Sequence, residues 1–352
     1  MKRTVLRGLV AVGLVAALVP AMAARTLEIY FIDVEGGQST LIVTPAGESL
    51  LVDTGFPGEG AFTSRPGPPE QARDARRILA AARDAGLAQI DYLLTTHFHA
   101  DHVGGVVELA QQLPIRAFID GGSPGPDAEA GVAGTMAAFA AYESVRATGR
   151  HLLVRPGDRL PLTGVEAVVV SAAGATLRAP LPGAGQPNTA CGNVAPPAQE
   201  KGENPRSTGF RLQLGRFRFL DLADLTGPPL FALVCPANLI GTVDAYLVAH
   251  HAGGDAADVS TFAALQPRVA IVNNGPAKGG DPLTLAAMRQ VKAIEDIWQL
   301  HRSTSGGAQN AVDERTANLD ETTAHWLKLS ANEDGSFVVT NGRTGLSRRY
   351  AR

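Results

Sequence analysis

Four side chains that commonly bind metal ions lie close together in the first half of the chain. They are His97, His99, Asp101 and His102, in the segment Thr-Thr-His-Phe-His-Ala-Asp-His-Val-Gly-Gly. In an extended or turning segment, residues two apart point the same way, so His97 and His99 can share one metal ion. Asp101 and His102 are then available to a second ion nearby. This density of imidazole and carboxylate groups predicts a metal site.

The sequence on either side of this segment predicts a strand followed by a helix. Ile90 to Thr96 has the β-branched and aromatic content of a buried strand. Val106 to Leu113 is typical of a helix, which must stop at Pro114. The metal-capable residues therefore leave the end of a strand, which is where α/β sheets present ligand sites.

The pattern His-x-His-x-Asp-His followed by Gly-Gly resembles the signature of the metallo-β-lactamase-fold hydrolases, a superfamily whose active sites hold two metal ions. This resemblance implies an α+β fold, the four-layer αββα sandwich, formed as one domain by residues 24–352. The opening strands and the turn Asp33 to Ser39 resemble most closely the hydrolase domain of the competence protein ComEC. There the turn reads Asp-Val-Gly-Gln-Gly-Asp, and this chain differs from it at Glu35, Gly36 and Gln38.

The same resemblance implies further site residues. Asp53 matches an aspartate that steadies the metal-site loop through hydrogen bonds. Asp224 matches the carboxylate that bridges the two ions, with Asp221 as the alternative. The pair His250-His251 resembles a His-His-Gly-Ser segment of ComEC-like hydrolases. Because adjacent side chains diverge, we expect His251 to bind metal and His250 to face the substrate, although the two roles could be exchanged.

The segment from Ala172 to Ser207 has almost no periodicity, and we expect it to form a flap over the site. Its Glu203-Asn204 resembles an Asn-rich segment of ComEC-like relatives, so Asn204 is expected to line the site. Superfamily members often carry a histidine ligand in a Gly-His-Thr setting in this region. The chain has no histidine there, which argues against a true β-lactamase.

These residues predict hydrolysis as the chemistry. A pair of divalent ions can hold a bridging water, lower its pKa and polarise the attacked group. Imidazoles and carboxylates suit zinc, with manganese or iron also possible. Asp101 or Asp224 could relay a proton to the leaving group. We expect a metal-dependent hydrolase of an ester-type bond, with small-molecule or phosphodiester substrates favoured. The alternatives are a β-lactam or lactone hydrolase and a non-catalytic binding or sensing protein.

Residues 1–23 are typical of a secretory signal peptide, with a basic start, an apolar stretch and an Ala-x-Ala end. The apolar stretch of 12 residues is shorter than the ~20 that a membrane span needs. We therefore expect a periplasmic or secreted protein without a membrane span. Removing Lys2, Arg3 and Arg7 moves the formal net charge from −3 to −6. This acidic balance argues against a stable nucleic-acid complex. Oligomeric state stays open.

Composition and the remaining landmarks give weaker expectations. With 45% hydrophobic residues, the chain should build a core of one large or two ordinary domains. Cys191 and Cys235 permit one disulfide in an oxidising compartment, or two thiols. His151 is expected at the surface, and His301 at the end of a helix from Pro282 to Leu300. Other expected elements are helices over Gln71–Ala85 and Met136–Thr148, and a hairpin over Trp326–Ser330 and Ser336–Thr340.

Overall fold

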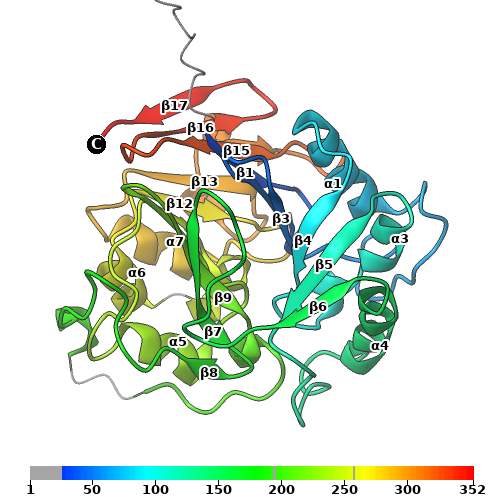
Figure 1. The fold of residues 1–352 in the computed structure, drawn as a ribbon. Helices are drawn as coiled ribbons and strands as arrows, with labels where there is room; N and C mark the ends of the chain where they lie inside the picture. Colours follow the sequence, from blue (N-terminus) through cyan, green and yellow to red (C-terminus); the bar gives the residue numbers. More distant parts are fainter. Residues whose placement is uncertain (1–25, 193–195, 257) are drawn as a thin grey trace, which may run out of the picture.

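A computed structural model describes residues 26–192, 196–256 and 258–352. The expected signal peptide lies outside these residues. Two β-sheets pack face to face, and helices cover the outer face of each sheet (Figure 1). No helix within the described part of the chain has the length and apolar character that crossing a bilayer requires.

The first sheet has nine strands in the order β17-β16-β15-β1-β2-β3-β4-β5-β6. Strands β3 to β6 run parallel to one another, whereas the pairs from β17 to β3 are antiparallel. The strands are β1 (Leu27–Phe31), β2 (Thr40–Val43), β3 (Ser49–Val52), β4 (Ile90–Leu94), β5 (Ile115–Asp120), β6 (Arg150–Leu153), β15 (Leu327–Ala331), β16 (Phe337–Asn341) and β17 (Ser347–Tyr350).

The second sheet has eight strands in the order β14-β13-β12-β11-β10-β9-β7-β8. Strands β10 to β14 are parallel to one another, whereas β9 and β10 form an antiparallel hairpin across Gly215-Arg216. The strands are β7 (Glu166–Ala172), β8 (Ala175–Thr176), β9 (Gly209–Leu214), β10 (Phe217–Asp221), β11 (Ala245–Leu247), β12 (Val269–Val272), β13 (Asp296–His301) and β14 (Thr316–Asn318).

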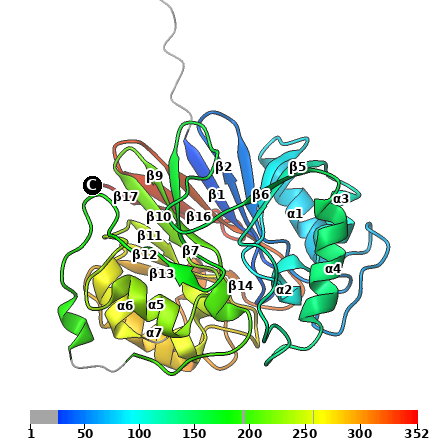
Figure 2. The same cartoon turned by 60° about the horizontal axis from the view of Figure 1, so that its bottom comes forward.

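The helices form the two outer layers (Figure 2). Those beside the first sheet are α1 (Arg73–Asp84), α2 (Ala100–Val103), α3 (Val106–Ala110) and α4 (Thr135–Arg146). Those beside the second sheet are α5 (Gly227–Val234), α6 (Val259–Leu265) and α7 (Pro282–Arg289). The order helix, sheet, sheet, helix confirms the expected four-layer sandwich.

Alternation along the strands produces these layers. In β1, Leu27, Ile29 and Phe31 belong to the core between the two sheets. Tyr30 points the other way, into the core under the helices of the first sheet, because successive strand residues face opposite sides. Both faces of the first sheet are therefore buried here, and each needs its own apolar layer.

The expected helix from Pro282 to Leu300 is wrong. Helix α7 ends at Arg289, and β13 begins at Asp296 between β12 and β14. All six residues of β13 are buried, so the strand lacks the alternation that would distinguish it from a buried helix. His301 consequently ends a strand instead of capping a helix.

Other expectations agree with the structure. The helices α1 and α4 and the β15–β16 hairpin lie within two residues of their expected bounds. Helix α3 stops earlier than expected, at Ala110, and is preceded by the single turn α2. Cys191 and Cys235 form a disulfide, which ties the irregular segment before β9 to the end of α5.

Candidate metal centre

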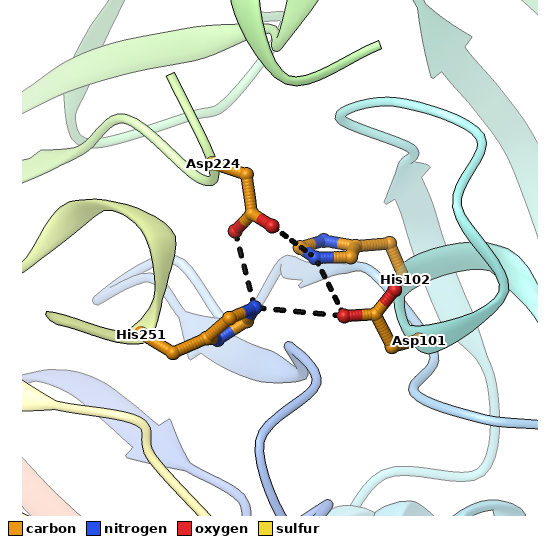
Figure 3. Close-up of side chains that lie close together, drawn as sticks. All are labelled: Asp101, His102, Asp224 and His251. Atoms are coloured by element: carbon orange, nitrogen blue, oxygen red, sulfur yellow. Dashed lines mark ion pairs between the residues drawn. The ribbon is translucent and has the colours of Figure 1, made fainter. Parts of the chain in front are cut away.

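Six metal-capable side chains from both sheets converge at one place. Four of them follow β4, one follows β10, and one follows β11. They form two donor groups that share one carboxylate. The first donor group is His97, His99 and Asp224, and the second donor group is Asp101, His102, Asp224 and His251. Figure 3 shows how the side chains of the second donor group point toward one another, Asp101 and His102 from α2 and Asp224 and His251 from two other segments.

Distances within the second donor group suit a tetrahedral ion. His102 Nε2 lies 3.1 Å from Asp224 Oδ2 and 3.5 Å from Asp101 Oδ2. His251 Nε2 lies 3.2 Å from Asp224 Oδ1 and 3.6 Å from Asp101 Oδ2. Donors bonded to a tetrahedral zinc ion at about 2.1 Å are about 3.4 Å apart. The four side chains therefore have the spacing that a shared ion requires.

The first donor group is equally close. His97 Nε2 lies 3.0 Å from His99 Nδ1 and 3.9 Å from Asp224 Oδ2. The Asp224 carboxylate thus faces both groups, which is the position of the expected bridging residue. Asp221, the alternative, lies outside both groups. It accepts hydrogen bonds from Gln38 Nε2 at 3.0 Å and from the Ala223 amide at 2.9 Å.

Several nitrogen and oxygen atoms of the two donor groups are buried without a hydrogen-bond partner. They are His99 Nε2, Asp101 Oδ1, His102 Nε2, Asp224 Oδ1 and both ring nitrogens of His251. An unpaired buried polar atom costs about 1–3 kcal/mol, so a cluster of them is unfavourable unless a ligand satisfies it. Cations satisfy imidazole and carboxylate lone pairs together. The residues therefore fit a pair of divalent metal ions.

The charge states of His97, His99 and Asp101 also suit metal binding. Burial lowers the pKa of His97 well below its ordinary value, and His102 and His99 lower it further. Burial also lowers the pKa of His99 to about 4. Both rings are thus neutral, which is the form that binds metal. Burial disfavours charge on Asp101, but Lys278 and His102 hold its pKa well below its usual range.

Asp53 contacts the second donor group through the ring nitrogen of His102 that faces away from Asp101 and Asp224. Its carboxylate accepts hydrogen bonds from His102 Nδ1 at 2.7 Å, from Thr96 Oγ1 at 2.6 Å and from the Thr96 amide at 2.8 Å. The proton on Nδ1 leaves Nε2 of His102 free to face Asp101 and Asp224. The structure thus places Asp53 where it can fix both the ring and its tautomer.

A glycine turn packs against the metal-site loop from the other side. The Gln38 amide donates to the Asp101 carbonyl oxygen at 3.0 Å. A Cβ at Gly37 would contact that same oxygen, so the close approach requires glycine. This contact explains why a glycine turn follows β1. His301, at the end of β13, supports the start of the turn, with its Nε2 2.8 Å from Asp33 Oδ1.

The two adjacent histidines occupy different positions. His250, His251 and Ala252 all have left-handed backbone, with φ of 50°, 54° and 57°. Such strain concentrates at functional sites. It turns His251 inward, to 1% side-chain exposure, and leaves His250 at the rim with 25%. Of the two, only His251 belongs to a donor group found among the described residues.

His250 lies between Asp255 and the donor groups. Its Nδ1 is 2.8 Å from Asp255 Oδ1, and its Nε2 is 3.2 Å from Asn204 Nδ2 and 3.7 Å from Asp224 Oδ2. Burial opposes its charge, but Asp224 and Asp255 raise the pKa of His250 to about 8. Asn204 thus contacts His250 beside the donor groups.

Sequence reasoning missed Lys278, whose ammonium contacts the Asp101 carboxylate. The order of strands offers a signal for this lysine. The Lys-Gly-Gly turn follows β12, and β12 pairs in parallel with β11, the strand that precedes His251. His151 and His301, which the sequence places elsewhere, also lie outside the donor groups. His151 sits on β6 with its Nε2 3.0 Å from Asp120, and His301 pairs with Asp33.

Comparisons with known proteins agree with this geometry. Residues 32–173 match the family model of the metallo-β-lactamase superfamily. A UPF0173 metal-dependent hydrolase of Herpetosiphon aurantiacus is 35% identical over 87 residues. That match covers 24% of this chain and 29% of the relative, less than a third of its length.

The similar solved structures are distant in sequence. The metallo-β-lactamase fold protein YhfI of Bacillus subtilis has a TM-score of 0.45 and 11% identity, covering 78% of this chain and 96% of that one. MEM-A1, a subclass B3 metallo-β-lactamase from a soil metagenome library, has a TM-score of 0.38 and 14% identity, covering 69% and 86%. The narrower likeness to the ComEC hydrolase domain rests on sequence motifs alone. The family model over residues 32–173 and the four-layer arrangement of the two sheets and their helices identify the metallo-β-lactamase fold.

Proposed function

We propose that the protein is a metal-dependent hydrolase that uses two divalent ions, with zinc favoured, to cleave an ester-type bond. Phosphodiesters are favoured over β-lactams and lactones. The observation that carries this proposal is the convergence of two donor groups on the shared carboxylate of Asp224. Figure 3 shows the second of these groups. The description of the Herpetosiphon relative as a metal-dependent hydrolase supports it.

The donor groups assign the ligands. His97 and His99 would hold one ion, Asp101, His102 and His251 the other, and Asp224 would contact both. The bound pair would supply an activated water and polarise the attacked group. Asp53 keeps His102 in the tautomer that this arrangement needs.

His250 is suited to donate a proton to the leaving group. Asp255 fixes its ring from the solvent side, while Nε2 points toward Asn204 and Asp224. In the metal-free protein, Asp224 and Asp255 raise the pKa of His250 to about 8. The contact with Asp255 would favour a proton on this ring, which His250 could give up during bond cleavage. Its partial exposure leaves room for a leaving group at the rim.

We also propose that the protein is exported. The basic and apolar residues 1–23 have the pattern of a signal peptide, and the Cys191–Cys235 disulfide suits an oxidising compartment. A small-molecule ester or phosphodiester is the proposed substrate. A stable complex with nucleic acid is not proposed, because the chain without residues 1–23 has a formal net charge of −6 (−3 minus the three charges of Lys2, Arg3 and Arg7).

Metal content measured beside hydrolysis of bis(p-nitrophenyl) phosphate tests the proposal. We expect about two ions per chain in the wild type, and loss of both an ion and activity in His99→Ala and His251→Ala. His151→Ala is the matched control, because this histidine lies outside both donor groups and should change neither quantity. Two ions without turnover would direct the search to carboxyl esters, lactones and β-lactams. Absence of bound metal in the folded protein supplied with zinc or manganese would overturn the proposal.

A further inference from the structure

A cation lies at the rim of the second donor group. The ammonium of Lys278 contacts Oδ2 of Asp101, whereas its side chain keeps 33% of its surface exposed. Lys278 therefore reaches from the solvent side to the edge of the proposed metal site. None of the roles assigned so far uses this residue.

The backbone holds Lys278 in this position. The Gly275 amide donates to the Lys278 carbonyl oxygen at 2.8 Å, which closes the turn after β12. The Gly280 amide donates to the His251 carbonyl oxygen at 2.8 Å, which joins the same turn to a proposed metal ligand. A Cβ at Gly36 would lie 2.8 Å from Cβ of Lys278, so the glycine turn after β1 packs directly on the lysine stem. The turn after β12 and the glycine turn after β1 together fix the position of the lysine.

An aromatic surface adjoins the lysine. Nζ of Lys278 lies 5.1 Å from the ring centre of Phe62 and 5.9 Å from that of Phe56. The two rings meet edge to face at 5.0 Å. Phe56 is buried, but Phe62 is 48% exposed. An exposed aromatic group and a cation therefore stand side by side next to the donor groups.

We propose that Lys278 and Phe62 form a substrate subsite for esters that carry a negative charge at the scissile group and a flat apolar substituent beside it. This inference rests on the proposed function. A divalent ion at Asp101 attracts that carboxylate more strongly than a single ammonium does and repels the ammonium. Lys278 then turns toward the open side, where Phe62 lies. Its flexible stem and point charge suit a phosphate or carboxylate oxygen.

The charge balance favours an anionic substrate. Two divalent ions bring four positive charges, and Asp101 and Asp224 supply two negative ones within the donor groups. Lys278 adds a further positive charge at the rim. The site therefore keeps an excess of positive charge that an anionic ester complements and a neutral ester does not.

Two chromophoric esters that share the same aryl group separate the two contacts. For the metal-loaded protein, Lys278→Ala should raise the KM for bis(p-nitrophenyl) phosphate about ten- to hundredfold, the effect of a charge-assisted hydrogen bond. The KM for neutral p-nitrophenyl acetate should change less than about twofold, because that ester offers no charge to the lysine. Lys278→Arg should retain most of the affinity. Phe62→Ala should weaken both esters, since both carry the aryl group.

Lys328→Ala is the matched control. Lys328 also lies over an aromatic ring, 4.6 Å from the centre of Tyr30, and pairs with Glu28, but it belongs to β15, away from the donor groups. The Lys328→Ala substitution should leave both KM values and the metal content unchanged. Metal content is measured for every variant, so that loss of an ion is not mistaken for loss of substrate affinity.

Calorimetric titration of the metal-loaded protein with phenylphosphonate tests the subsite without turnover. If the wild type hydrolyses neither ester, the proposed function fails for these substrates, whereas weaker phenylphosphonate binding in Lys278→Ala still supports the subsite. Equal losses for both esters, or a lower metal content in Lys278→Ala, would show that the lysine maintains the metal site, and would overturn the inference. Unchanged KM and unchanged phenylphosphonate affinity would overturn it as well.

Discussion

Replacing Asp53 by asparagine should weaken one metal ion selectively. Oδ2 of Asp53 accepts hydrogen bonds from His102 Nδ1 and Thr96 Oγ1, and Oδ1 accepts from the Thr96 amide. Asparagine has one oxygen for these donors. If its NH₂ group faces His102, the ring must keep its proton on Nε2, the atom that faces Asp101 and Asp224. If the NH₂ group instead faces the Thr96 amide, two donors meet and the strand end shifts.

The size of the effect follows from outer hydrogen bonds at metal sites. Loss of such a partner lowers metal affinity about 10- to 100-fold, which is about 1.4–2.7 kcal/mol. His102 belongs to the second donor group and not to the first. The loss should therefore fall on one of the two ions, and the affinity for the other should stay within about threefold of the wild type.

Competition between the protein and a chromophoric chelator for zinc gives the two stepwise dissociation constants. Asp91→Asn is the matched control, because Asp91 also accepts hydrogen bonds from the amide and the hydroxyl of a single residue, Ser49, both at 3.0 Å. It lies on β4 away from the donor groups and should leave both constants unchanged. A folded Asp53→Asn protein with wild-type constants, or with equal losses for both ions, would refute the assigned role of Asp53.

The Cys191–Cys235 disulfide joins residues that are 44 positions apart in the sequence. Reducing it should lower the free energy of unfolding, measured in urea titrations, by about 4 kcal/mol. An unfolding midpoint that stays the same with and without reductant would contradict this. Burial raises the pKa of Asp221 from 3.8 to about 7, so the folded state keeps a proton that the unfolded state releases, and stability should fall as the pH rises between these values. In the metal-free protein, Asp221→Asn should reduce the fall in unfolding free energy between pH 5 and pH 8 by about 3 kcal/mol. If the unfolding free energies of wild type and variant change with pH in the same way, this prediction is wrong. Gly37→Ala should lower the unfolding free energy by about 1–3 kcal/mol, because the added methyl group meets the Asp101 carbonyl oxygen. Gly67→Ala, with open space around its Cβ, should change the Tm little, and equal effects of the two substitutions would contradict the packing argument.

The part of the site that could be predicted from the sequence is the part formed by neighbouring residues. His97 to His102 follow a strand directly, so local pattern alone brings them together. Asp224 and His251 meet them only because β10 and β11 pair in the second sheet and the two sheets pack together. Their positions came from a family resemblance, since spacing in the sequence carries no information about that packing.

Two failures have a common physical origin in long-range packing. The strand β13 is buried on both faces, so its apolar run has no alternation and resembles a continuation of α7. Lys278 stands 177 residues from Asp101, and its own surroundings in the sequence are an ordinary glycine turn. In both cases the local sequence does not show which distant segment the residues pack against, and that packing determines their structure.

The pairing of β1 with β15 constrains how this protein can be made. Leu27 lies opposite Ala331, so one edge of β1 stays open until the chain is available for folding as far as Ala331. Contacts between such distant residues slow folding, and an unpaired strand edge invites association with other chains. Deleting β15 to β17 would leave the same edge open permanently. Aggregation during folding, rather than loss of the metal ligands, is the failure expected of truncated forms.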